Sequence, residues 1–183
     1  DELIIDTHYL SEEIKNFLKT KNYEISINIT QEQELLDTGG GILNATKKFG
    51  NNPFFVLNPD TIWSKNYYEE LKILENSYLE NNKPILLLVD KKISHDKSFK
   101  GDFNLKKNKY IIREAANQYI FTGAQIINRS IFEGVKEKVF SMNLAWNKII
   151  KEKILLGQES NQTFFHVNNL KVYEELNKLK FID

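Results

Sequence analysis

The chain has 183 residues, with 25 Lys and Arg, 25 Asp and Glu, 41% apolar residues and no cysteine. Its length suits one domain with a buried core, and its balanced charge provides no long-range field to concentrate nucleic acid or an anionic membrane. The missing cysteines exclude disulfides, thiolate metal sites and thiol nucleophiles, so we expect a cytoplasmic protein. The balanced charge predicts no nucleic-acid or membrane partner.

The first half of the chain alternates short apolar runs with amphipathic segments. The patterns predict strands at residues 3–5, 24–29, 53–57 and 84–90, and helices at 11–19 and 67–79. A loop through Thr38-Gly39-Gly40-Gly41 is predicted to enter a short helix that ends near Gly50. Asp60 follows the third strand directly, at the kind of strand end where open α/β sheets bind ligands.

The second half departs from strict alternation. Strands are predicted at residues 101–105, 110–114, 119–127 and 163–167, and helices at 130–134, 143–153 and 170–179. The middle strands follow one another without helices, so we expect them to be antiparallel. Because no linker interrupts the pattern, residues 1–183 are predicted to form one α/β domain, with a mostly parallel sheet and an antiparallel insertion.

Four motifs occur in a fixed order along the chain. They are Glu34–Ile42, which contains the glycine triplet, Phe54–Asp60, Gly101-Asp102-Phe103 and Phe121-Thr122-Gly123. Together they resemble the sugar-1-phosphate nucleotidyltransferase family, most closely the N-acetylmuramate-1-phosphate uridylyltransferases and mannose-1-phosphate guanylyltransferases. The resemblance implies a three-layer Rossmann-like fold and a role in forming nucleotide sugars for the cell envelope.

The glycine triplet is the most specific of these motifs. Without Cβ atoms, Gly39, Gly40 and Gly41 can adopt positive φ and let backbone amides approach a nucleotide. The alternative is a turn that leads into a helix. The resemblance implies that the three glycines face the base and ribose, and that Thr38 helps to shape the loop.

Asp60 and His166 are the candidate metal ligands. Mg²⁺ takes oxygen ligands and needs only one or two protein carboxylates, so Asp60 can begin a site; the alternative is a turn-forming aspartate after Pro59. His166 stands where the family carries a second aspartate. Imidazole is a poor ligand for Mg²⁺ but an acceptable one for Mn²⁺, and His166 could instead bond a phosphate or have no ligand.

The sugar side of the pocket is assigned by resemblance to Gly101, Asp102 and Gly123. The region after Asp90 is where the family receives its sugar phosphate. Each of these residues could instead serve only a turn or a crowded strand.

The implied reaction joins a sugar 1-phosphate to a nucleoside triphosphate and releases pyrophosphate, with no general base because the attacking phosphate is already anionic. The family's phosphate-binding Gly-x-Gly-x-Arg loop does not occur in this sequence, and Arg113 and Arg129 are its only arginines. The family's first strand, phosphate loop and helix are thus expected to be lacking, and an open sheet edge predicts self-association. The alternative function is a non-catalytic nucleotide or sugar-phosphate binding module, or a truncated, inactive relative.

Overall fold

A computed structural model describes residues 2–178, and the chain divides into two compact units. Unit 1 is built from Asp1–Asn52 and Arg129–Lys148, and unit 2 from Pro53–Asn128 and Ile149–Asp183. Each unit therefore combines two segments that are distant in sequence. The single domain expected over residues 1–183 stays a prediction.

Unit 1 contains a two-stranded parallel sheet and two complete helices, α1 and α2. Strand β1 (Glu2–Thr7) pairs with β2 (Ser26–Gln31), and they are joined by α1 (Ser11–Lys19). Helix α2 (Asp37–Ala45) follows and contacts β1. The second segment adds a 3₁₀ turn, Arg129–Phe132, and the beginning of α4 (Met142–Lys151).

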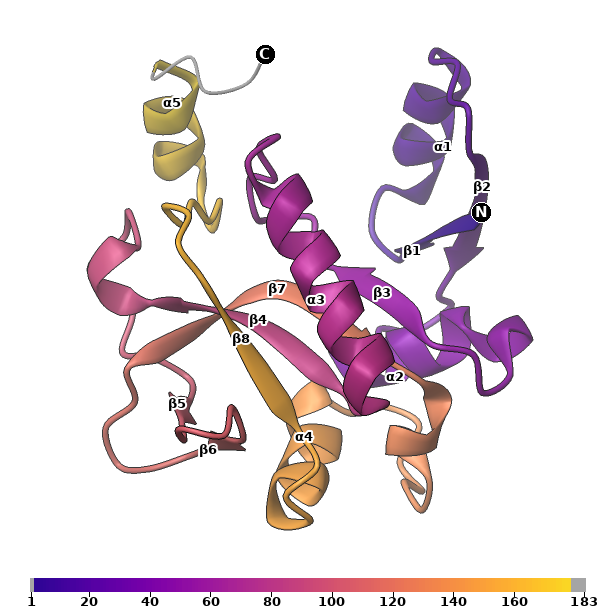
Figure 1. Ribbon diagram of the computed structural model, residues 1–183. Coiled ribbons are helices and arrows are strands. Elements are labelled where there is room, and N and C mark those ends of the chain that lie inside the picture. Colours follow the sequence, from indigo (N-terminus) through magenta and orange to yellow (C-terminus); the bar gives the residue numbers. More distant parts are fainter. Residues whose placement is uncertain (1, 179–183) are drawn as a thin grey trace. The chain divides into compact units, whose positions relative to one another are not determined.

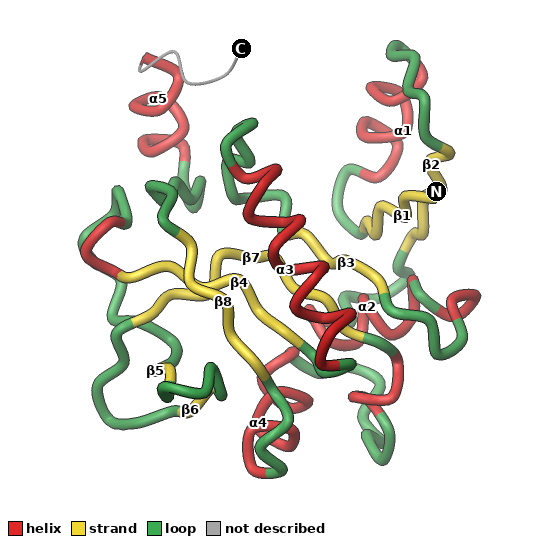
Figure 2. Tube along the Cα trace, viewed as in Figure 1, coloured by secondary structure: helices red, strands yellow, loops and turns green. Residues whose placement is uncertain are grey.

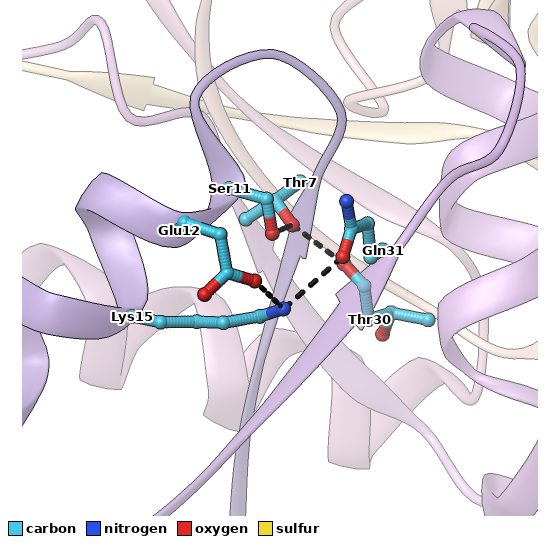
Figure 3. Close-up of polar contacts among 6 residues, drawn as sticks. All are labelled: Thr7, Ser11, Glu12, Lys15, Thr30 and Gln31. Carbon is cyan, nitrogen blue, oxygen red and sulfur yellow. Dashed lines mark hydrogen bonds and ion pairs between the residues drawn. The ribbon is translucent and has the colours of Figure 1, made fainter.

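Hydrogen bonds at the ends of the two strands fix α1 to this sheet, as Figure 3 shows. The hydroxyl groups of Thr7 and Ser11 lie 2.9 Å apart, and the Thr7 hydroxyl donates to the Thr30 carbonyl. The Lys15 ammonium group donates to Glu12 at 2.6 Å and to Gln31 at 3.1 Å. The carboxyl ends of β1 and β2 are thus tied to each other and to α1.

Unit 2 contains a four-stranded sheet with the order β3-β7-β4-β8 (Figure 1). The strands are β3 (Phe54–Leu57), β4 (Ile85–Asp90), β7 (Tyr119–Ile127) and β8 (Leu156–Ser160). The β4 and β8 strands are parallel, and β7 runs antiparallel to both β3 and β4. Three strands therefore share one direction, so the mostly parallel α/β sheet that we predicted is confirmed.

Helix α3 (Tyr67–Asn81) packs on one face of this sheet. Its Leu74 and Tyr78 side chains are buried against Ile85, Leu87 and Ala124 of the strands. The apolar residues of β4 are completely buried, which explains why the run from Ile85 to Val89 lacks polar alternation.

The remaining elements of unit 2 are short. Strands β5 (Asn104–Leu105) and β6 (Ile111–Ile112) form an antiparallel pair, which confirms the predicted insertion. Helix α5 (Leu170–Lys178) is the last element in Figure 2, and residue 179 of the predicted helix lies outside the described residues. Within residues 2–178, no helix has the length and apolar character needed to cross a membrane.

Two sequence-based assignments in unit 2 are wrong. Residues 163–167 form no strand; Phe164 and His166 make only isolated bridges, to Ser94 and Thr61. The missed strand is β8, whose polar sequence Leu-Gly-Gln-Glu-Ser has no apolar alternation. It is buried because Gly157 lets Leu88, Leu105 and Ile111 pack closely, with a Cβ position 2.5 to 3.1 Å from their side chains.

Candidate functional site

Asp60 lies in the turn that follows β3, and backbone hydrogen bonds hold this turn on both sides. The Asn58 amide donates to the Gly123 carbonyl at 2.9 Å, which ties the turn to β7. The Val167 amide donates to the Asp60 carbonyl at 2.7 Å, and Thr61 bridges His166. The segment around His166 is thereby fixed beside Asp60.

The Asp60 and His166 side chains are in direct contact. His166 Nε2 lies 3.1 Å from Asp60 Oδ2, and the Asp60 side chain is 44% exposed against 23% for His166. The imidazole ring packs against Phe99 and Phe164, with ring centroids 5.6 and 5.9 Å away. The pair therefore has a fixed histidine and an aspartate that remains open to a ligand.

Each member of this pair also carries a buried polar atom without a hydrogen-bond partner. These atoms are Asp60 Oδ1 and His166 Nδ1. A buried polar group without a partner costs about 1–3 kcal/mol, so such atoms in a native site call for a ligand or water. This unsatisfied pair makes the turn the candidate binding site.

The donor set fits a divalent cation. A carboxylate oxygen and an imidazole nitrogen suit Mn²⁺ well, and Mg²⁺ through the carboxylate. Within residues 2–178, no three His, Cys, Asp or Glu side chains form a group that could hold a metal. An ion at Asp60 and His166 would therefore take its other ligands from substrate oxygens and water.

Gly123 brings β7 against the Asp60 turn. Its φ is +95°, and a Cβ atom would lie 2.7 Å from Asn58 Cβ and 3.2 Å from Thr61 Oγ1. The pairing of β4 with β7 shifts register nearby, between Leu86 and Leu88, as in a β-bulge. The glycine is thus required for close approach, while its predicted contact with the sugar stays a prediction.

Gly101 and Asp102 lie in the loop before β5, beside the beginning of β7, where the Asp102 amide donates to the Tyr119 carbonyl at 2.6 Å. Gly101 has a φ of +85°, and a Cβ atom there would lie 2.5 Å from the Asn117 carbonyl. The Asp102 carboxylate accepts the Phe121 amide at 2.9 Å. Because Phe121 is two residues from Gly123, about 7 Å along β7, Asp102 and the turn that carries Asp60 are bonded to neighbouring positions of one strand.

Two charged residues around this site, Asp96 and Arg113, are not among the predicted site residues. Hydrogen bonds from Ser98 lower the pKa of Asp96, and the charges of His166 and His95 contribute smaller effects. The Arg113 guanidinium carbon lies 4.6 Å from the Phe103 ring centroid; burial lowers the pKa of Arg113, and Asp102 opposes that shift. The polar stretches that carry these residues resemble solvated loops, and only the folded contacts reveal them.

The glycine triplet belongs to unit 1 and lies in α2, so the predicted loop is wrong. Gly39 and Gly40 both donate their amides to the Phe140 carbonyl, at 2.9 and 3.0 Å. None of the three glycines is among those with positive φ. Glycine is required at these helical positions because neighbouring groups occupy the space that side chains would fill.

Each glycine of the triplet admits a different neighbour. A Cβ atom on Gly39 would lie 2.4 Å from the Phe140 ring, and one on Gly40 would lie 2.5 Å from the Lys138 carbonyl. A Cβ atom on Gly41 would lie 2.6 Å from Asp6 Oδ2. The Thr38 hydroxyl accepts the Met142 amide at 3.0 Å. These contacts explain why close packing within unit 1 requires glycines at this motif. Its role toward a nucleotide stays a prediction.

Comparisons with known proteins agree with this architecture. No family model matches the sequence. A stretch of 63 residues is 36% identical to D-glycero-α-D-manno-heptose 1-phosphate guanylyltransferase from Aneurinibacillus thermoaerophilus. It covers 34% of this chain and 27% of that enzyme, so the match spans about a quarter of the relative's length.

Solved structures match over nearly the whole chain. HddC from Yersinia pseudotuberculosis superposes with a TM-score of 0.75 and 20% identity, over 98% of this chain and 79% of that one. UDP-glucose pyrophosphorylase from Acinetobacter baumannii gives a TM-score of 0.74 and 14% identity, over 99% and 79%. The chain therefore has the Rossmann-like nucleotidyltransferase fold, which confirms the predicted fold class and the resemblance indicated by the motifs.

Proposed function

We propose that the protein forms a nucleotide sugar and pyrophosphate from a sugar 1-phosphate and a nucleoside triphosphate. The observation that carries the proposal is the unsatisfied Asp60–His166 pair at the carboxyl end of β3. Its support is the fold, which is shared with HddC bound to GMP-PN and with a UTP-bound UDP-glucose pyrophosphorylase. We propose the cytoplasm as its compartment and cell-envelope biosynthesis as its role.

The reaction is a substitution at phosphorus. An oxygen of the sugar 1-phosphate bonds to the α-phosphorus of the triphosphate, and the bond from that phosphorus to the pyrophosphate oxygen breaks. The attacking oxygen is already anionic, so the chain has to align the two phosphates and offset their charge rather than remove a proton.

Asp60 and His166 are the residues that would hold the divalent ion, for which we propose Mg²⁺ with Mn²⁺ as the alternative. A bound cation would offset negative charge on the reacting phosphates. Asp60 suits this role because its carboxylate is partly exposed, whereas the aromatic rings of Phe99 and Phe164 keep His166 in one orientation.

The remaining predicted residues define the two substrate regions of this proposal. Gly101, Asp102 and Gly123 belong to the sugar-phosphate region, where positive φ at both glycines lets backbone lie close to a ligand. Thr38 and Gly39–Gly41 belong to the nucleotide region, where packing within unit 1 fixes the backbone before any ligand arrives.

A two-part assay tests the proposal. The protein is incubated with each of the four common ribonucleoside triphosphates and a set of hexose and heptose 1-phosphates, and pyrophosphate and nucleotide sugar are quantified. Calorimetry with the same compounds is run in parallel. Pyrophosphate and nucleotide sugar in equal amounts support the enzyme. Binding without pyrophosphate would instead establish the non-catalytic binding module.

A further inference from the structure

Two carboxyl groups and a glycine meet in unit 1, outside the residues already assigned to the reaction. A Cβ atom built on Gly41 would lie 2.6 Å from Asp6 Oδ2 and 2.8 Å from Glu32 Oε1. Both carboxyl oxygens therefore press against the same point of the α2 backbone. This contact joins the ends of β1 and β2 to the helix that carries the glycine triplet.

The strand register explains why the two carboxyl groups meet. Asp6 pairs with Thr30, and Glu32 lies two residues beyond Thr30, so period-two alternation puts both acidic side chains on one face. The Glu32 amide donates to the Thr7 carbonyl at 2.8 Å, which continues the pairing past the end of β2. Thr7 is itself bonded to Ser11 and Thr30 (Figure 3), which holds the backbone next to Asp6 in place.

The surroundings of Asp6 favour its protonated form. Burial, a side-chain hydrogen bond with Glu32 and the charge of Glu32 raise the pKa of Asp6 to about 7, and a backbone hydrogen bond at Thr7 opposes them. Glu32 is almost fully buried, and its Oε2 accepts the Leu36 amide at 3.0 Å. Glu32 therefore fixes the start of α2 through this backbone hydrogen bond.

The charged groups on the surrounding elements have partners of their own. From the segment after β1, the His8 ring lies 3.2 Å from the Glu32 carbonyl oxygen. Around the start of α2, Glu34 pairs with Lys138, and Asp37 accepts the Thr38 amide. From α1, Lys15 bonds Glu12 and Gln31, and from β1, Glu2 accepts Asn28. A shared proton is thus the direct means of relieving repulsion between Asp6 and Glu32.

We propose that Asp6 is a positioning residue for the glycine helix: the proton it shares with Glu32 holds both carboxyl groups against Gly41, and its loss loosens the start of α2. Nucleotide binding at the glycine triplet is then linked to one proton, a consequence that rests on the proposed function. Loss of the proton leaves two carboxylates in contact, and their repulsion acts directly on the helix that must be rigid.

The test compares the wild type with Asp6→Asn between pH 5.5 and 8.5. An asparagine amide donates a hydrogen bond to Glu32 at every pH, so it mimics the protonated aspartic acid. GTP and UTP affinities of the wild type should fall up to about tenfold between pH 6 and 8, as one linked proton allows. The affinities of Asp6→Asn should stay within twofold of the wild-type value at pH 6.

Two controls make the comparison specific. Triphosphates themselves titrate near neutral pH, so the relevant quantity is the difference between the variant and the wild type. Glu2→Gln removes a carboxyl group from the same face of β1, at a residue bonded to Asn28, and should retain the wild-type pH profile. Equal pH dependence in the wild type and Asp6→Asn, or a flat but weak profile in Asp6→Asn, would overturn the proposal.

Hydrogen exchange without nucleotide separates this proposal from the proposed function. After correction for intrinsic rates, the amides of residues 39–43 should lose protection above about pH 7 in the wild type and keep it in Asp6→Asn. This result without nucleotide binding at any pH would support the proton linkage and contradict the proposed function. Nucleotide binding with unchanged protection and affinity across the range would contradict the linkage alone.

Discussion

The glycine helix of unit 1 and the Asp60 turn of unit 2 differ in how well their polar groups are satisfied. In α2, the amides of Gly39 and Gly40 bond to Phe140, and each glycine faces a group of the protein itself. In the turn, Asp60 Oδ1 and His166 Nδ1 are buried without a partner. Both segments carry family-like motifs, yet only the second leaves donors and acceptors unused.

This difference separates a rigid framework from a site that still requires a ligand. A segment whose hydrogen bonds are complete loses stability when it is altered, because its contacts are internal. A segment with unsatisfied atoms tolerates alteration in the free protein and loses function, because its missing partner is the ligand. The two regions should therefore respond to mutation in opposite ways.

The largest effect is expected for Asp60→Asn. The amide keeps the size of the side chain but removes the charge that a divalent ion needs, and a lost ligand costs several kcal/mol of transition-state stabilisation. Pyrophosphate release in the presence of Mg²⁺ or Mn²⁺ should fall about a thousandfold. The melting temperature should change little, because the partly exposed side chain has no partner besides His166 in the contacts that define the turn.

Asp96→Asn is the matched control for this change. Asp96 is also an aspartate near His166, but its carboxylate is engaged by Ser98. Its replacement should leave pyrophosphate release within a few-fold of the wild type. Near-normal activity of Asp60→Asn would show that Asp60 does not bind the metal, and the proposed difference between the two regions would then be wrong.

Gly40→Val should act on stability rather than on chemistry. Its Cβ would lie 2.5 Å from the Lys138 carbonyl and 3.0 Å from Leu36 Cβ, and a backbone carbonyl cannot rotate away. We expect a loss of about 3 kcal/mol in the free energy of unfolding, measured by urea denaturation. Gly134→Asn is the control, because nothing lies within 4 Å of that position and asparagine tolerates its positive φ. Equal stability of the two variants would show that the triplet is not packed as described.

Gly123→Ala should lower both the free energy of unfolding and pyrophosphate release, each by less than the variants above. The residue has a φ of +95°, and the added methyl group would meet Asn58 in the turn before Asp60. The strain should lower the free energy of unfolding by about 2 kcal/mol. Pyrophosphate release measured below the melting transition should also fall, because the turn that carries Asp60 is displaced. A stability loss with unchanged kinetics would make Gly123 a purely structural residue.

Most of the fold could be predicted because apolar periodicity reports burial. The predicted bounds of α1 and β7 agree with the structure, and α3 begins where its pattern begins. Strand β8 could not be found in this way, since Gln158 and Glu159 interrupt any apolar alternation and its burial depends on neighbouring strands. The apolar Phe164-Phe165 pair wrongly predicted a strand, because the segment that pairs with it is a loop.

The candidate site was only partly predictable from the sequence. The resemblance selected Asp60 and His166, and the structure brings them to 3.1 Å. Spacing alone could not do so, since 106 residues separate them and their segments are aligned by the Thr61 bridge and the Val167–Asp60 backbone hydrogen bond. The Asp6–Glu32 pair had a weak signal in the alternation of β2, but its meeting with Gly41 depends on how α2 packs. Residue types alone do not show that these side chains meet; the packing of the folded chain brings them together.

The smallest effect is expected on the pH dependence of stability, and it tests how α2 is held in unit 1. The pKa of Asp6 is about 7 in the folded protein and about 4 in an unfolded chain. Between these values the folded state binds more protons, so this group's contribution to the free energy of unfolding decreases as pH rises from about 4 to about 7 and is constant above.

Urea unfolding midpoints of the wild type and Asp6→Asn should therefore diverge over that window, with the wild type losing stability relative to the variant. Solvent screening at the exposed part of Asp6 keeps the change below those of the glycine variants. Parallel profiles for the two proteins would show that Asp6 and Glu32 ionise independently, and α2 would then be held by packing alone.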